Sequence, residues 1–282
     1  MAPDGGQGYR IGGSFYQTLT AAVADLAEYG FDSAERVEIW IRRIREAAVY
    51  SMTPPHVLER SLQETFRSIY RDKIERGGIL RQHPGVPKFT IDRVKPRLRG
   101  ALDRAIMASA SQIKIDRTVA IEKVVQRFSG WATSIPAGGS DAVSKVDTKA
   151  DIKKSIATIA YQERRVNIDQ GHKFVANLNN IIAVDGGALA AKWHSHAGEM
   201  NYNYRPEHAK REGHIFVVRD NWAIQRGLMK LDGAKYTDEI DQPAEFVYCR
   251  CYYEYLYSLR RLPDSMLTEK GRSEMAAGKR AA

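Results

Sequence analysis

The chain has 282 residues, of which 43% are hydrophobic and 27% charged, and its formal net charge is +9. This composition is too apolar for a disordered protein, and the absence of any run of 18 apolar residues excludes a membrane-spanning helix. The positive charge favours a polyanionic neighbour, either nucleic acid or an acidic protein surface, although many proteins that bind neither are equally basic.

Residues 1–14 are expected to form a flexible arm. The segment is rich in glycine and lacks the charged start and apolar block of a signal peptide. We therefore expect a protein that is made and kept in the cytoplasm, where cysteine thiols stay reduced.

Residues 15–134 are expected to form a helical domain, because apolar residues recur at helical spacing along most of this stretch. Ser33 is placed to cap the second helix, and Gly77 to terminate the third. The predicted helices cover residues 15–29, 33–53, 56–75, 90–104 and 115–128. The β-branched residues of the last segment leave a strand open as an alternative.

The helix that follows a Pro/Gly-rich connector at 82–88 is strongly basic. Its cationic side chains could contact a nucleic-acid backbone, since phosphate contacts come mainly from lysine and arginine. The alternative is an ordinary solvated helix face. The basic residues are Lys88, Arg93, Lys95, Arg97, Arg99 and Arg104.

Residues 134–140 are rich in proline and glycine and predict the boundary to a second module at 141–263, with a charged tail at 264–282. A helical run at 150–178 is read as one helix or two. Short β-type runs follow at 188–193, 214–219 and 246–251, and a helix is expected at 252–262. The predicted fold class is α+β, predominantly helical, with a helical N-terminal half and a compact C-terminal module that contains short strands.

Six potential metal ligands crowd into this module. The only two cysteines are one residue apart, and four of the seven histidines lie in the sixty residues before them. Imidazole and thiolate are the ligands that zinc prefers, so a structural zinc site is one interpretation. The alternative needs no cofactor: histidines hydrogen-bonded within a compact fold, and buried cysteines. The residues are His194, His196, His208, His214, Cys249 and Cys251.

The common catalytic signatures are absent, because the chain has no P-loop, no G-x-S-x-G elbow and no H-E-x-x-H motif. We therefore expect no enzyme. One catalytic alternative stays open, a metal-dependent nuclease that uses His194, His196 and His208, and a DNA-binding protein built on the helical half is another.

Read in order, the C-terminal half resembles the phage head morphogenesis family typified by the F protein of phage Mu. The matching features span residues 150–262 and are Gln162-Glu163, Trp193, an Arg-x-x-His at Arg205–His208, Gly213 and Cys249-Arg250-Cys251. The resemblance implies a minor structural protein of a tailed-phage head that acts in head assembly and, in some members, in DNA packaging or delivery. We expect no cofactor, with a structural zinc as the alternative.

The family also implies partners and a location. The expected partners are the portal protein, the major capsid protein or both, with packaged DNA as an additional one and no membrane. The protein would be made in the host cytoplasm and reside in the virion head near the portal vertex, in several copies per virion.

On this resemblance, the motif residues would build the structural framework of the module. Arg205 is expected to form a buried pair with Glu163, because a guanidinium offers a fork of donors that suits a carboxylate. His208 would bridge the loop before Gly213. The framework residues are Glu163, Trp193, Arg205, His208, Gly213, Cys249, Arg250 and Cys251.

Overall fold

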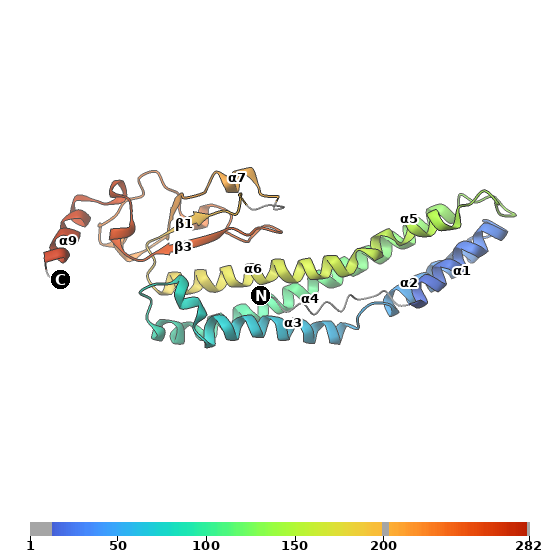
Figure 1. Cartoon of the computed structure of the whole chain (residues 1–282), viewed down its shortest axis with the longest axis horizontal. Helices are drawn as coiled ribbons and strands as arrows, with labels where there is room; N and C mark the ends of the chain where they lie inside the picture. Colours follow the sequence, from blue (N-terminus) through green and yellow to red (C-terminus); the bar gives the residue numbers. More distant parts are fainter. Residues whose placement is uncertain (1–12, 199–202, 281–282) are drawn as a thin grey trace. The chain divides into compact units, whose positions relative to one another are not determined.

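A computed structural model describes residues 13–198 and 203–280. These residues are mostly helical, with one small three-stranded antiparallel sheet in the C-terminal part (Figure 1), which confirms the predicted α+β class. The predicted arm at 1–14 lies outside the described residues apart from its last two positions, which begin the first helix. No described helix is long and apolar enough to cross a bilayer.

The chain divides into two compact units. The first comprises Met1–Gln63 with Met107–Asn167, and the second comprises Glu64–Ile106 with Ile168–Ala282. The boundary predicted at 134–140 instead lies inside the first unit, where it forms the turn between two helices. A split that passes through long helices leaves no loop-like signature in the sequence.

In the first unit, α1 (Gly13–Tyr29) packs against α2 (Ala34–Tyr50) and α5 (Lys145–Ala157). As predicted, the Ser33 hydroxyl caps α2 by accepting a hydrogen bond from the backbone N–H of Arg36 at 3.3 Å. The core of this unit is made of apolar side chains that include Phe15, Leu19, Leu26, Ile44, Val124, Phe128, Ile152 and Ile156.

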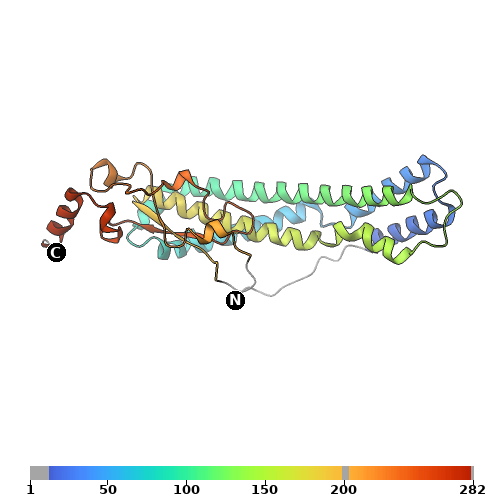
Figure 2. The ribbon, with the colours of Figure 1, turned by 90° about the horizontal axis from the view of Figure 1, so that it is seen from above.

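Three longer helices carry residues of both units. The helix α3 (Pro55–Tyr70) continues into a π-helical turn (Arg71–Glu75) and ends before Gly77, which has φ +73°, as predicted. The helix α4 (Lys88–Ala132) is one uninterrupted helix of 45 residues (Figure 2), so the two separate helices predicted here and the strand alternative are wrong. The helix α6 (Ile159–Asp185) is separate from α5, which selects two helices over one.

The sheet has the order β2-β1-β3. The central strand β1 (Ala190–His194) pairs antiparallel with β2 (Ile215–Val217) and with β3 (Tyr252–Leu256), and the first two strands confirm the predictions. The strand predicted at 246–251 and the helix predicted at 252–262 are wrong, because 252–256 forms the strand. Alternating aromatic side chains stabilise a half-buried strand through cross-strand contacts such as that between Trp193 and Tyr253.

A 3-10 turn at Gly78–Gln82 precedes α4. Short elements connect the strands and follow them: α7 (Pro206–Ala209), α8 (Trp222–Gln225) and 3-10 turns at Thr237–Glu239, Leu259–Arg261 and Asp264–Met266. Part of the tail at 264–282 is helical, as α9 (Glu269–Arg280).

Gly30 is expected to be indispensable at the end of α1. It has φ +72°, and a Cβ added there would lie 1.8 Å from the carbonyl oxygen of Pro136. Gly30→Ala is therefore expected to lower the free energy of unfolding by more than the roughly 1–2 kcal/mol that a left-handed conformation alone costs.

Gly138→Ala is the matched control, because Gly138 has φ +90° and nothing within 4 Å of the added Cβ. Urea unfolding of both variants separates the steric clash from the backbone strain. Equal losses in the two variants would contradict the prediction.

Candidate functional site

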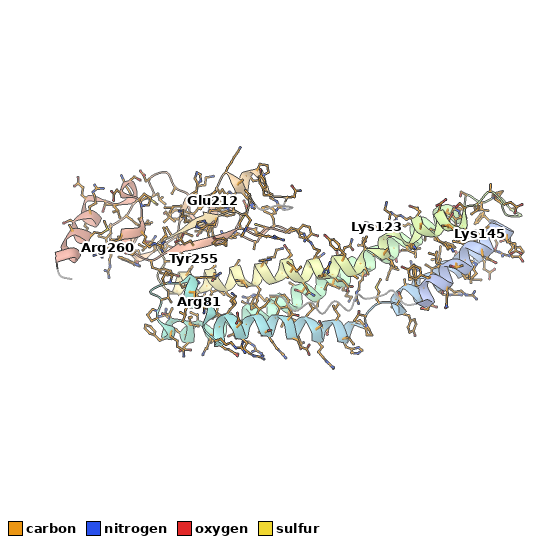
Figure 3. All side chains as sticks on the ribbon, in the orientation of Figure 1. Arg81, Lys123, Lys145, Glu212, Tyr255 and Arg260 are labelled. Carbon is orange, nitrogen blue, oxygen red and sulfur yellow. The ribbon has the colours of Figure 1, made fainter. Side chains whose placement is uncertain are left out.

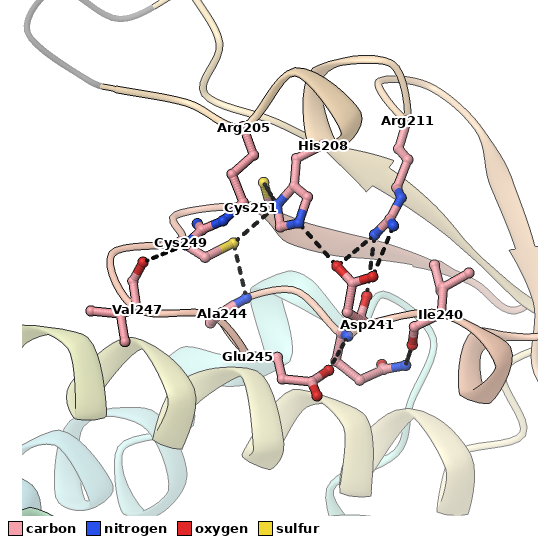
Figure 4. A network of polar contacts seen from close by, with 11 residues as sticks. Arg205, His208, Arg211, Ile240, Asp241, Ala244, Glu245, Val247, Cys249 and Cys251 are labelled. Carbon is pink, nitrogen blue, oxygen red and sulfur yellow. Dashed lines mark hydrogen bonds and ion pairs between the residues drawn. The ribbon is translucent and has the colours of Figure 1, made fainter.

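Three of the six predicted metal ligands converge in the second unit. His208, Cys249 and Cys251 are at most 6% exposed, and their ligand atoms all lie within 4.8 Å of one another. The Nδ1 atom of His208 is 3.5 Å from Sγ of Cys249 and 3.6 Å from Sγ of Cys251 (Figure 4). Both cysteines are free thiols.

Local backbone geometry brings these side chains together. Pro206 opens the single turn of α7, which places the buried His208 on its inner side. Before Cys249 the chain bends sharply at Tyr248, which has φ +64° and donates its backbone N–H to the Asp169 carboxylate at 2.6 Å. Cys251 then directly precedes β3. The Cys-x-Cys segment therefore lies between a tight turn at Tyr248 and the start of a strand.

A carboxylate orients the imidazole from its other side. Nε2 of His208 lies 2.9 Å from Oδ2 of Asp241, close enough for an ion pair but not aligned as a hydrogen bond. Arg211 holds Asp241 through two hydrogen bonds of 2.8 Å each. These hydrogen bonds from Arg211 lower the pKa of Asp241 to about 2, so the group is a carboxylate at neutral pH.

Aromatic side chains line the site. The ring of Trp193, which is fully buried, meets His208 edge to face at a centroid distance of 5.2 Å and Tyr253 at 5.5 Å. Phe246 lies 5.8 Å from the His208 ring, and the Arg211 guanidinium stacks over Trp193 at 5.0 Å. The three potential ligands are thus buried beside aromatic rings, with one charged pair, Arg211 and Asp241, next to them.

The two thiols differ in their surroundings. The pKa of Cys249 is lowered, first by a hydrogen bond from the Cys251 thiol and further by the backbone N–H of Ala244, which lies 3.4 Å from the sulfur, and by His208. Cys249 is therefore the thiol that is more readily present as a thiolate.

The other three histidines predicted as ligands do not join this group. Successive side chains of a strand point to opposite faces, so His194 lies across β1 from Trp193 and the cluster. Its two ring nitrogens are each 3.1 Å from a carboxylate oxygen, one of Glu212 (labelled in Figure 3) and one of Glu254. His196 lies beside the Tyr252 ring instead, and His214 is exposed.

The predicted pair between Arg205 and Glu163 is wrong. Glu163 is instead paired with Arg117, 46 residues earlier, and the two atoms Oε1 and Nε are 2.5 Å apart. Arg205 donates to the carbonyl oxygen of Val247 at 3.2 Å and stacks over Phe246. A sequence pattern cannot distinguish between arginines as partners for one buried glutamate.

Of two further predicted framework residues, Gly213 lies at a turn of the module and Arg250 lies on its surface. Gly213 has φ +75° and donates its N–H to the carbonyl oxygen of Trp193 at 2.9 Å, so a glycine is suited to the turn before β2. Arg250 was expected inside the module, but its side chain is exposed.

The predicted nucleic-acid face lies on α4, and most of its charges have acidic neighbours. Arg93 and Arg97 both contact Asp185, and Lys95 lies 2.6 Å from Asp92. Arg99 is 3.9 Å from Asp103, whereas Lys88 and Arg104 are exposed on the same helix. These acidic partners reduce the positive charge that this face offers to a phosphate backbone.

Sequence reasoning missed the residues that support the site. Arg211 follows His208 at a spacing of three, which places both on one side of a helical turn and is a weak signal. Asp241 and Ala244 lie in an irregular segment about thirty residues later and carry no recognisable pattern.

The pair between Glu254 and His194 is expected to make stability depend on pH. The His194 hydrogen bond, followed by that of Arg261, lowers the pKa of Glu254 below its ordinary value of 4.5. Because the folded pKa is the lower one, this contribution is present above pH 4.5 and is lost as the pH falls through the folded pKa.

Glu254→Gln should therefore destabilise the protein at pH 7 by about 0.2–1 kcal/mol, the usual range for a partly exposed pair, and by less at pH 3. Urea unfolding of variant and wild type at the two pH values measures this difference. An equal gap at both pH values would contradict the assignment.

No protein-family model, curated protein or solved structure matches the chain.

Proposed function

We propose that the chain is a minor structural protein of a tailed-phage head, associated with the portal and acting in head assembly and in DNA packaging or delivery. The observation that carries the proposal is the convergence of the motif residues. Trp193, His208, Cys249 and Cys251 surround one buried point, and Arg205 lies against the same segment through Val247 and Phe246.

This convergence supports the resemblance because order along a chain does not require proximity. The motif residues span nearly sixty positions from Trp193 to Cys251. Residues that match a family pattern by chance would scatter over the fold, whereas these build one structural unit. The exceptions are Glu163, which belongs to the first unit, and the exposed Arg250.

The alternatives receive less support from the geometry. The nuclease hypothesis needs His194 and His208 to act on one substrate, but they belong to opposite sides of β1. The DNA-binding hypothesis needs free cations on α4, and four of the six candidates lie beside a carboxylate.

The test is quantitative mass spectrometry of density-purified virions from the phage or lysogen that encodes the chain. We expect a few to a few dozen copies per particle, counted against the major capsid protein. Absence from both virions and procapsids would overturn the proposal.

A plasmid-nicking assay distinguishes the nuclease alternative from the head-protein proposal. Purified protein with Mg²⁺, Mn²⁺ or Zn²⁺ is expected to leave supercoiled plasmid intact. Metal-dependent nicking that is lost in His194→Ala would favour the nuclease instead.

A further inference from the structure

We propose that the second unit binds one zinc ion through Nδ1 of His208 and the thiolates of Cys249 and Cys251. The inference goes beyond a role in the phage head, and it is independent of that role. It rests on the geometry of three buried groups and of the residues that hold them.

The distances fit a shared ion. With Zn–S bonds of about 2.3 Å and Zn–N bonds of about 2.0 Å at tetrahedral angles, a sulfur and a nitrogen on the same zinc lie about 3.5 Å apart. Nδ1 of His208 is 3.5 Å from one sulfur and 3.6 Å from the other. A ring nitrogen has either one proton or one lone pair, so hydrogen bonding alone accounts for only one of these two contacts.

The surrounding groups are those that a zinc ligand needs. Histidine ligands commonly donate their second nitrogen to a carboxylate, which orients the ring. Here Asp241 lies 2.9 Å from Nε2 of His208, and Arg211 fixes Asp241 through both of its oxygens. The backbone N–H of Ala244, 3.4 Å from the Cys249 sulfur, is placed to stabilise a thiolate.

Charge balance also favours the ion. One Zn²⁺ neutralises two thiolates, so the site carries no net charge in a pocket lined by aromatic rings. Two thiols and an imidazole with soft sulfur donors select zinc over magnesium or calcium. Within the described residues these three groups form the ligand set, so the protein supplies three of the four ligands of a tetrahedral site.

The ion would cross-link two segments of the chain that are distant in sequence. It links the single turn of α7 to the irregular chain before β3, across 41 and 43 residues of sequence. The regular elements here are short, since β2 has three residues and α7 four. A small region with little regular structure gains much of its stability from such a link, because the free energy of metal binding becomes free energy of folding.

The first experiment uses the full chain, purified under reducing conditions with zinc in the medium. We expect one zinc per chain by elemental analysis, and a lower melting temperature after chelation that recovers when zinc is added back. Titration of the metal-free protein with Co²⁺ should produce thiolate-to-cobalt charge-transfer absorption and the intense visible bands of tetrahedral cobalt.

Variants assign the ligands. Cys249→Ser and His208→Gln are expected to weaken cobalt binding by more than tenfold, whereas His214→Gln and His194→Gln should leave it unchanged. Asp241→Asn should weaken binding by about 10–100-fold and keep the charge-transfer absorption, because it removes an outer partner and no ligand.

The wild-type measurements stand even where a variant fails to fold. Substoichiometric zinc in the reduced wild-type chain, or a cobalt complex without charge-transfer absorption, would overturn the proposal. A Cys249–Cys251 disulfide in protein isolated without reductant, together with no metal uptake after reduction, would also overturn it. None of these readouts depends on virions, so failure here and failure of the head-protein proposal are distinguishable.

Discussion

Glu163→Ala is expected to lower the free energy of unfolding by about 3–5 kcal/mol, because it leaves the Arg117 guanidinium buried without its counter-charge. The side chains of Arg117 and Glu163 are 11% and 10% exposed, and their atoms Nε and Oε1 are 2.5 Å apart. Arg117 also donates to the carbonyl oxygen of Thr53 at 2.7 Å, which holds it in place. Urea unfolding followed by far-ultraviolet circular dichroism measures the loss.

Glu122→Ala is the matched control in the same unit. Glu122 receives hydrogen bonds from Arg45 at 3.0–3.2 Å, but the two side chains are 45% and 46% exposed. An exposed pair of this kind contributes about 0.2–1 kcal/mol. A loss in Glu163→Ala no larger than that in Glu122→Ala would show that burial of the Arg117 pair does not govern its contribution.

Trp193→Ala is expected to cost about 3–5 kcal/mol, the range for removing a fully buried aromatic side chain. The indole contacts the rings of His208, Phe216 and Tyr253 and lies under the Arg211 guanidinium. Its loss leaves a cavity beside the two cysteines and removes the support of the His208 ring. The same unfolding measurement applies.

Phe89→Ala controls for the loss of an aromatic side chain as such. Phe89 is 67% exposed, so its removal should change the free energy of unfolding by less than about 0.5 kcal/mol. Trp193→Phe, which keeps an aromatic ring in the cavity, is expected to fall between the two. A Trp193→Ala variant as stable as Phe89→Ala would show that the buried indole contributes no more to the free energy of unfolding than an exposed ring.

Much of the helical structure could be predicted from local patterns. Apolar spacing located α1, α2 and α3, and the capping residue Ser33 and the left-handed Gly77 marked two of their ends. These signals are local because helix hydrogen bonds and caps join residues that are a few positions apart. The merger of two predicted helices into α4 shows the limit, since residues 105–114, which the prediction left out, continue the helix without a break.

The third strand shows how a periodicity can be misread. The aromatic run Tyr252–Leu256 predicts a helix by its apolar content, but in the structure it is a strand whose alternate residues Tyr253 and Tyr255 face one side. A short aromatic run is compatible with a helix and with a strand, and here its pairing with β1 makes it a strand. Strand pairing joins distant segments, so it is not encoded in any single window of sequence.

Residue patterns alone were enough to predict the helical class, two of the three strands and the six side chains from which a metal site could be chosen. That His208, Cys249 and Cys251 meet while His194 lies across the strand, and that Arg117 and not Arg205 partners Glu163, became visible only in the folded chain. Side-chain chemistry is a property of each residue, whereas proximity between residues forty positions apart depends on how the whole chain packs.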